Sequence, residues 1–154
     1  MENLESIIIH HPFWSGLNSQ HFPVLVKGAS WVRFAPGELI SREGEEADHF
    51  YLILRGEISL QTDIQGQGPV TIQTISPGDA LGWSWLLPPF RWHFNARAAL
   101  ESEAIAWNTQ YLRAQAEENP SFGYDLASRM TKVLLARLHA THMQLVDFYG
   151  GSQD

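Results

Sequence analysis

Residues 50–58, FYLILRGEI, combine an unbroken apolar run with a glycine turn. Five consecutive apolar residues at 50–54 are typical of a short strand that is buried on both faces or lies near a barrel interior. The segment Arg55–Glu57 then provides a turn, because the glycine at its centre readily adopts the positive φ of tight corners. This stretch therefore predicts a buried strand followed at once by a reversal of the chain.

Similar short apolar runs extend on both sides, from residue 29 to residue 107. They follow a period of two and contain many aromatic and β-branched residues, which favours strands. Turn signals separate them at 36–37, 43–44, 55–57, 66–69 and 77–79. Strands at this spacing, without long helices between them, predict a sandwich or barrel rather than alternating strands and helices.

The two flanks of this β region have helical patterns. Residues 1–28 predict a helical lead-in, in which Asn3 is suited to cap the first turn. Residues 108–149 predict a short helix that stops at Asn119-Pro120, then a long helix from 121 to 149 that ends at Gly150-Gly151. The fold class expected is mainly β with flanking helices, as one domain over residues 1–154.

The long helix carries two apolar stripes. Leu126, Met130 and Val133 form the first, which suits packing on the barrel. The second steps by four and three residues, as in a heptad repeat, through Leu134, Leu138, Thr141, Leu145 and Phe148. We expect a homodimer through the helix at 121–149, with the alternative that both stripes pack within one domain.

The order of elements and the spaced glycine turns resemble the cyclic-nucleotide-binding domain family of catabolite activator-like regulators. The segments that carry the resemblance are PGELI at 36–40, EGE at 43–45, FYLILRGEI at 50–58 and ISPGDALG at 75–82. The resemblance implies a double-stranded β-helix, or jelly-roll barrel, followed by a long C-terminal helix. Only residues 150–154 follow that helix here, so we expect no DNA-binding helix-turn-helix.

The resemblance also implies a ligand site in a cassette, residues 82–98, which reads GWSWLLPPFRWHFNARA. In the family, a Gly-Glu pair begins a short helix whose N–H groups face the nucleotide phosphate, and a later Arg pins the phosphate. Gly82 matches, but Trp83 replaces the Glu that holds the ribose. Trp92 stands where the Arg belongs, with Arg91 one residue early. Without both anchors, affinity for cyclic AMP should fall by roughly two to four powers of ten.

Three interpretations of the cassette remain open. The indoles fill the former pocket and close it, giving a ligand-free protein-interaction module. Alternatively, aromatic faces and cations form a remodelled pocket for a small anionic or aromatic ligand. The third is retained cyclic-nucleotide binding. The predicted ligand-binding residues are Gly82, Trp83, Ser84, Arg91, Trp92 and His93. We expect a stand-alone small-molecule sensor that does not bind cyclic AMP in the usual way.

Composition excludes several other classes of function. The 154 residues include no cysteine and have a formal charge of −7, which excludes thiolate chemistry and disfavours a direct nucleic-acid surface. No targeting segment or membrane span is visible, so a cytoplasmic protein is expected. His139 and His142 share a helix face, but exposed pairs of this kind seldom bind metal. No catalytic constellation or cofactor motif is present, and we expect no enzyme activity.

Overall fold

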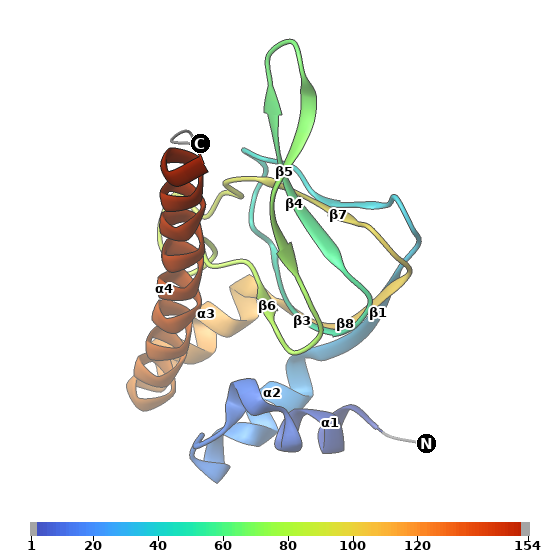
Figure 1. Ribbon diagram of the computed structural model, residues 1–154. Coiled ribbons are helices and arrows are strands. Elements are labelled where there is room, and N and C mark those ends of the chain that lie inside the picture. Colours follow the sequence, from blue (N-terminus) through green and yellow to red (C-terminus); the bar gives the residue numbers. More distant parts are fainter. Residues whose placement is uncertain (1–2, 152–154) are drawn as a thin grey trace.

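The structure, a computed structural model, describes residues 3–151 and begins with a helical lead-in (Figure 1). Its elements are α1 (Leu4–His10), the 3-10 turns η1 (Pro12–Trp14) and η2 (Ser19–His21), and α2 (Phe22–Gly28). The Asn3 side chain accepts the N–H of Ser6 at 2.8 Å, which confirms the predicted cap of α1. The lead-in ends where the first strand begins, at Ala29.

Eight strands follow and form two four-stranded antiparallel sheets, as expected for a jelly roll. Their bounds are β1 (Ala29–Phe34), β2 (Leu39–Ser41), β3 (His49–Arg55), β4 (Ile58–Ile64), β5 (Gly68–Ile75), β6 (Ala80–Leu81), β7 (Asn95–Ala98) and β8 (Ser102–Asn108). The strand orders are β1-β8-β3-β6 and β2-β7-β4-β5. The turn that joins β4 to β5, with the adjoining ends of both strands, extends beyond the other strands (Figure 1).

The core lies around the two inner strands of the first sheet, β3 and β8. Phe50 on β3 is paired in register with Trp107 on β8, and both side chains are fully buried. The indole N–H of Trp107 donates to the carbonyl of Leu25 at 2.8 Å, which fixes the lead-in to the sheet. Gly56 follows β3 with φ +96°, and a Cβ there would lie 2.1 Å from the Ser102 hydroxyl oxygen. The prediction of a doubly buried strand and a glycine turn at 50–57 is confirmed.

Two helices complete the chain, α3 (Thr109–Glu118) and α4 (Pro120–Gly151). The Asn108 side chain caps α3 by accepting the N–H of Tyr111 at 3.1 Å. The described part of α4 includes Gly150 and Gly151, two residues beyond the end predicted at 149. Two glycines in a last turn lower helix propensity by only about 1 kcal/mol each, which does not forbid the helix.

The two apolar stripes of α4 have different environments. Leu126 and Met130 are buried in the core and Val133 packs against it, which confirms the role predicted for the first stripe. The apolar members of the second stripe are exposed on the isolated chain, namely Leu134, Leu138, Leu145 and Phe148. No helix within residues 3–151 is both long and apolar enough to cross a membrane. The domain limits 1 and 154 remain predictions, since both lie outside the described residues.

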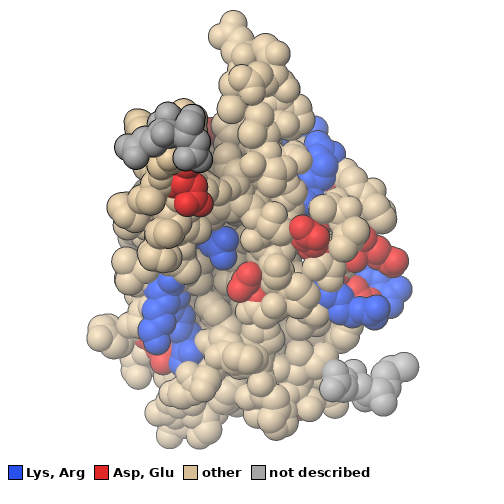
Figure 2. Space-filling model, viewed as in Figure 1, with Lys and Arg blue, Asp and Glu red and all other residues tan. Residues whose placement is uncertain are grey.

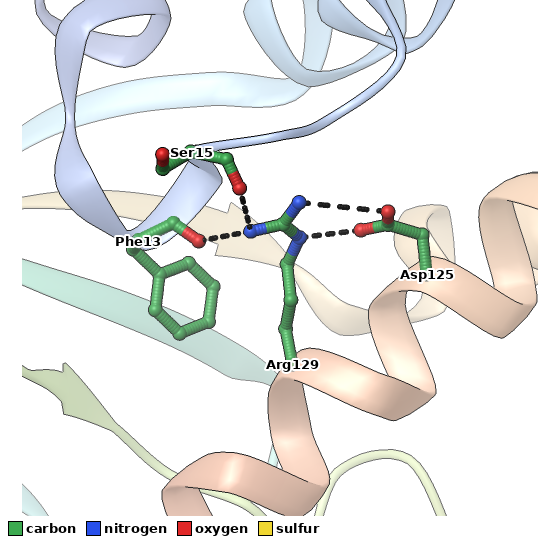
Figure 3. A network of polar contacts seen from close by, with 4 residues as sticks. All are labelled: Phe13, Ser15, Asp125 and Arg129. Carbon is green, nitrogen blue, oxygen red and sulfur yellow. Dashed lines mark hydrogen bonds and ion pairs between the residues drawn. The ribbon is translucent and has the colours of Figure 1, made fainter.

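A polar clasp joins α4 to the lead-in (Figure 3). Arg129 donates to the carbonyl oxygens of Phe13 and Ser15, at 2.5 and 3.0 Å. On its other side the guanidinium pairs with Asp125, one helical turn away. Arg129 therefore has partners both on its own helix and in the lead-in. It ties together segments that are more than one hundred residues apart in the chain.

Candidate functional site

The cassette begins at Gly82, directly after β6, in a conformation that requires glycine. Its φ is +104°, in the region that L-residues with side chains rarely adopt. A Cβ placed on Gly82 would lie 3.1 Å from Cη2 of Trp92 and 3.3 Å from its Cζ3. The Trp92 indole therefore packs against the backbone at the position where the family resemblance implied a phosphate.

The short helix that the resemblance implied after Gly82 is not present. Residues 83–89 form turns and bends instead. The N–H of Phe90 donates a hydrogen bond to the carbonyl oxygen of Leu87 at 3.0 Å. A row of N–H groups at a helix N-terminus is what makes an anion site there. The helix N-terminus that the resemblance implied for an anion is therefore not formed by residues 83–90.

Aromatic side chains fill much of the space beneath the cassette. Trp85, Trp92 and Phe94 are buried, whereas Trp83 is partly exposed. The rings of Trp92 and Phe94 are 5.8 Å apart in an edge-on arrangement, and those of Trp83 and Phe94 are 4.9 Å apart. Such pairs add packing energy beyond the area they bury. Trp83 is the member of this cluster that still offers a ring face at the surface.

Arg113, a side chain of α3, contacts the cassette loop at Trp85 and Phe90. Arg113 donates to the carbonyl of Trp85 at 2.6 Å, and its guanidinium carbon lies 4.1 Å from the centre of the Phe90 ring. This combines a charge-assisted hydrogen bond with a cation–π contact. No local sequence pattern points to Arg113, because its partners are more than twenty residues away in the chain.

The predicted site residues lie in three places. Gly82 and Trp92 contact each other in the cassette floor. Ser84, two residues after Gly82, is also buried. Trp83 and His93 line a groove that faces α4. Arg91 is exposed and donates to the carbonyl of Gly44 at 3.3 Å.

Arg91 is held at this rim by backbone pairing with residues 44–47. The N–H of Trp92 donates to the Glu45 carbonyl at 2.9 Å, and Arg91 forms an isolated β-bridge with Glu46. Arg91 therefore does not lie with Trp83 and His93 in the groove against α4.

The groove against α4, here called the cassette groove, has a volume of about 270 Å³. It is bounded by the β4–β5 hairpin, the cassette and α4. Its lining residues are Leu60, Ile72, Gln73, Trp83, His93, Phe94, Leu134, Arg137, Leu138 and Thr141. The lining is largely apolar and includes a few polar groups, a combination that small-molecule sites share.

Gln73 links the two walls of the cassette groove. Its side-chain amide donates to the Thr141 hydroxyl at 2.9 Å and to the Arg137 carbonyl at 3.2 Å. The Arg137 guanidinium donates back to the Gln73 amide oxygen at 3.2 Å. Arg137 Nε is buried and has no hydrogen-bond partner within the described residues. A buried donor left unpaired in this way is unusual and can be satisfied by an acceptor on a ligand.

Sequence reasoning missed Gln73 and Arg137 as groove residues. Thr141 was noticed only as a member of the second α4 stripe. The polar Gln73 within β5 and the cationic Arg137 beside that stripe were the available signals, but only the fold shows that they meet. Among residues 3–151, no three His, Asp or Glu side chains are arranged to hold a metal ion.

Comparisons with known proteins agree with this architecture. The sequence model of the cyclic nucleotide-binding domain matches residues 31–119, which is more than half of the chain. A crystal structure from Geobacter metallireducens, described as a cyclic nucleotide-binding protein, is 26% identical with a TM-score of 0.79, and the match covers 90% of this chain and all of the other.

Two more distant matches are regulatory proteins. A cAMP-activated global transcriptional regulator of Mycobacterium tuberculosis is 22% identical over 94% of this chain, which spans 62% of that protein. The guanosine-bound regulatory subunit of a cAMP-independent protein kinase A from Trypanosoma cruzi is 19% identical, with a TM-score of 0.70, over 96% of this chain and 50% of the other.

A lysophospholipase of Neurospora crassa is 24% identical over 71% of this chain, which spans only 7% of that enzyme. The similarity to these proteins therefore concerns one domain and does not extend to their full length. With the family match, the two-sheet architecture and the glycine-started cassette in agreement, the chain belongs to the cyclic nucleotide-binding domain family.

Proposed function

We propose that this chain is a regulatory sensor domain that binds a small molecule other than cyclic AMP, without catalysing a reaction. The observation that carries the proposal is the contact between Trp92 and Gly82, where a Cβ on the glycine would lie 3.1 Å from the indole. An indole supplies no charge to pair with a phosphate, which supports a ligand other than cyclic AMP. The open volume that remains beside the cassette lies in the cassette groove.

The lining of the cassette groove suggests the chemistry of the ligand. Trp83 and Phe94 offer aromatic surface for stacking on a planar group. The Arg137 guanidinium, with its unpaired Nε, is suited to an anionic end, and His93 stands at the same groove. A small aromatic anion satisfies both requirements. Gly82, Ser84, Trp92 and Arg91 do not line the cassette groove, so the proposal assigns them no direct contact with the ligand.

Binding in the cassette groove would be transmitted through α4. The helix is held to the β5 strand by the Gln73 contacts to Arg137 and Thr141, and by the Gln144 side chain bonded to the Ile72 carbonyl. A ligand that accepts from Arg137 Nε would engage the same guanidinium whose Nη1 donates to Gln73, and would so act on the contact that links α4 to β5. Ligand binding therefore biases the position of α4, as population-shift reasoning requires of a sensor.

The test is a calorimetric titration of the purified chain with cyclic AMP and cyclic GMP, followed by a thermal-shift screen of aromatic acids and nucleotides. We expect no low-micromolar binding of either cyclic nucleotide. An aromatic acid that occupies the cassette groove should raise the melting temperature of the wild type more than that of Trp83→Ala or Arg137→Gln, while Arg91→Gln serves as the matched control. Low-micromolar binding of cyclic AMP would contradict the proposal.

A second copy of the chain is the proposed partner of α4. Leu138, Leu145 and Phe148 are 63%, 53% and 72% exposed, so the second stripe lacks cover on the isolated chain. An apolar stripe of this length with heptad spacing suits a two-stranded interface. Sedimentation at several concentrations tests this, with Leu145→Glu expected to dissociate the dimer. A wild-type monomer at about 100 μM would contradict it, since one such stripe should give micromolar pairing.

The alternative is a ligand-free interaction module. It is favoured by the burial of Trp85, Trp92 and Phe94, which close the space under the cassette. Native mass spectrometry of the purified protein distinguishes the two, since a sensor with a tight ligand retains it. A location in the cytoplasm remains part of the proposal, as expected from the sequence.

A further inference from the structure

A second groove lies on the opposite side of Arg137, between the lead-in, the β5–β6 turn and α4. We call it the N-terminal groove, and its volume is about 450 Å³. Phe13 and Ser15 form one wall, Gly78 and Asp79 the second, and α4 the third. None of the cassette residues lines it, and Arg137 is the one lining residue that it shares with the cassette groove.

The charges along this groove are not balanced. Arg129 is neutralised by Asp125, as the clasp in Figure 3 shows. Within residues 3–151 neither Lys132 nor Arg137 makes an ion pair, and Asp79 is the one acidic residue in the lining. The groove therefore retains a positive charge on a chain whose formal charge is −7.

This charge is visible on the surface of the molecule. Figure 2 shows Lys and Arg atoms gathered over the lower half of α4 and along the edge where the helix meets the barrel. An isolated acidic group lies on the barrel side of that edge. A local positive potential of this kind attracts small anions in spite of the overall negative charge.

The groove also has an apolar floor. Val133 and Ala136 on α4 lie between Lys132 and Arg137 in the chain, and Phe13 faces them from the lead-in. The two cations are five positions apart on the helix, a rise of about 7.5 Å along the axis. A cation on each side of an apolar strip suits a ligand that has both a charged group and a hydrocarbon body.

From these observations we propose that the N-terminal groove binds a small organic carboxylate with an apolar body. The carboxylate oxygens accept hydrogen bonds from the Lys132 ammonium group, with the Arg137 guanidinium as the second donor, and the body lies on Phe13 and Val133. The inference does not rest on the proposed function. The two grooves share Arg137, so the tests below act on Lys132, which belongs to the N-terminal groove alone.

Selective lysine acetylation tests the site, because the chain has only two lysines, Lys27 and Lys132. Both are exposed, and Lys27 lies on α2, outside the N-terminal groove. The probe is phenylacetate, with neutral phenylacetamide and sodium chloride of equal ionic strength as controls. We expect phenylacetate to slow acetylation of Lys132 relative to Lys27, as read by peptide mass spectrometry. Equal rates, or equal protection by the amide, would overturn the proposal.

Substitutions provide the second test, by NMR titration with phenylacetate. Lys132→Gln should weaken binding by about fivefold, the loss typical of one partly exposed charged contact, while Lys27→Gln leaves it unchanged. Trp83→Ala should also leave it unchanged, which separates this site from the cassette groove. Equal affinity of wild type and Lys132→Gln would overturn the inference without affecting the proposed function. Loss of phenylacetate binding in Trp83→Ala would assign the probe to the cassette groove instead.

Discussion

Trp92 stands against Gly82 so closely that a single methyl group on the glycine would come within 3.1 Å of the indole. Two features of the cassette thus depend on each other. The positive φ of Gly82 allows the chain to turn after β6, and the missing side chain leaves room for a buried tryptophan. The floor of the cassette is consequently a packed apolar contact.

Trp92→Ala should lower the free energy of unfolding by about 3 kcal/mol, because it removes a buried indole and leaves a cavity beneath the cassette. Urea unfolding measures the loss. Trp83→Ala is the control. Because Trp83 is only half-buried, its removal should lower the free energy of unfolding by about 1 kcal/mol. Addition of 3-methylindole should raise the melting temperature of Trp92→Ala but not of the wild type. Equal losses in the two variants would contradict the packing role of Trp92.

Gly82→Ala should be more destabilising than Gly37→Ala, by about 1 kcal/mol. Both glycines have positive φ, +104° and +86°, so both substitutions impose backbone strain. Only at Gly82 does the new methyl group also meet a buried ring, whereas nothing lies within 4 Å at Gly37. Chemical unfolding of both variants isolates the contact from the strain. A Trp92→Leu substitution should remove the difference, and its persistence would show that Trp92 is not the cause.

Much of this fold could be predicted from local sequence signals. The apolar run at 50–54 and the turn at Gly56 predict β3 and its exit correctly, because both signals act over a few residues. Asn3 and Asn108 cap helices as their residue types indicate. These features need no knowledge of distant contacts.

The candidate site could be predicted only in part. Trp83 and Trp92 were identified from the family pattern, but which ring is buried and which faces a groove depends on how the cassette loop folds. Gln73 and Arg137 come together across 64 residues, and no local pattern reports that contact. The family pattern implied a short helix after Gly82, but residues 83–89 form turns and bends. This segment contains two tryptophans and the Pro88-Pro89 pair, and prolines inside a helix remove backbone hydrogen bonds.

Acidic pH should destabilise the chain through His11. The ring Nδ1 accepts the N–H of Phe13 at 3.0 Å, and burial lowers the pKa of His11 below its usual 6.5. As pH falls below 6.5, the unfolded chain takes up a proton that the folded chain resists, so stability decreases until the lowered folded-state pKa is reached. Urea midpoints at pH 7.5 and pH 5 measure the effect. His11→Asn keeps a cap acceptor without titrating and should show a smaller decrease, whereas the exposed His139→Asn should behave as wild type.

Arg129→Gln should release the lead-in from α4 and lower the free energy of unfolding by about 2 kcal/mol. The Arg129 side chain is only 11% exposed, and its removal leaves the Phe13 and Ser15 carbonyls without their charged donor and Asp125 without its partner. Limited proteolysis should show faster cleavage near residues 12–18. Asp125→Asn is the matched control, because it removes the ion pair but keeps the Arg129 hydrogen bonds to the Phe13 and Ser15 carbonyls. Its unfolding free energy should fall less than that of Arg129→Gln, and its cleavage should be slower. If Arg129→Gln were cleaved no faster than the wild type, the clasp would not be what holds the lead-in in place.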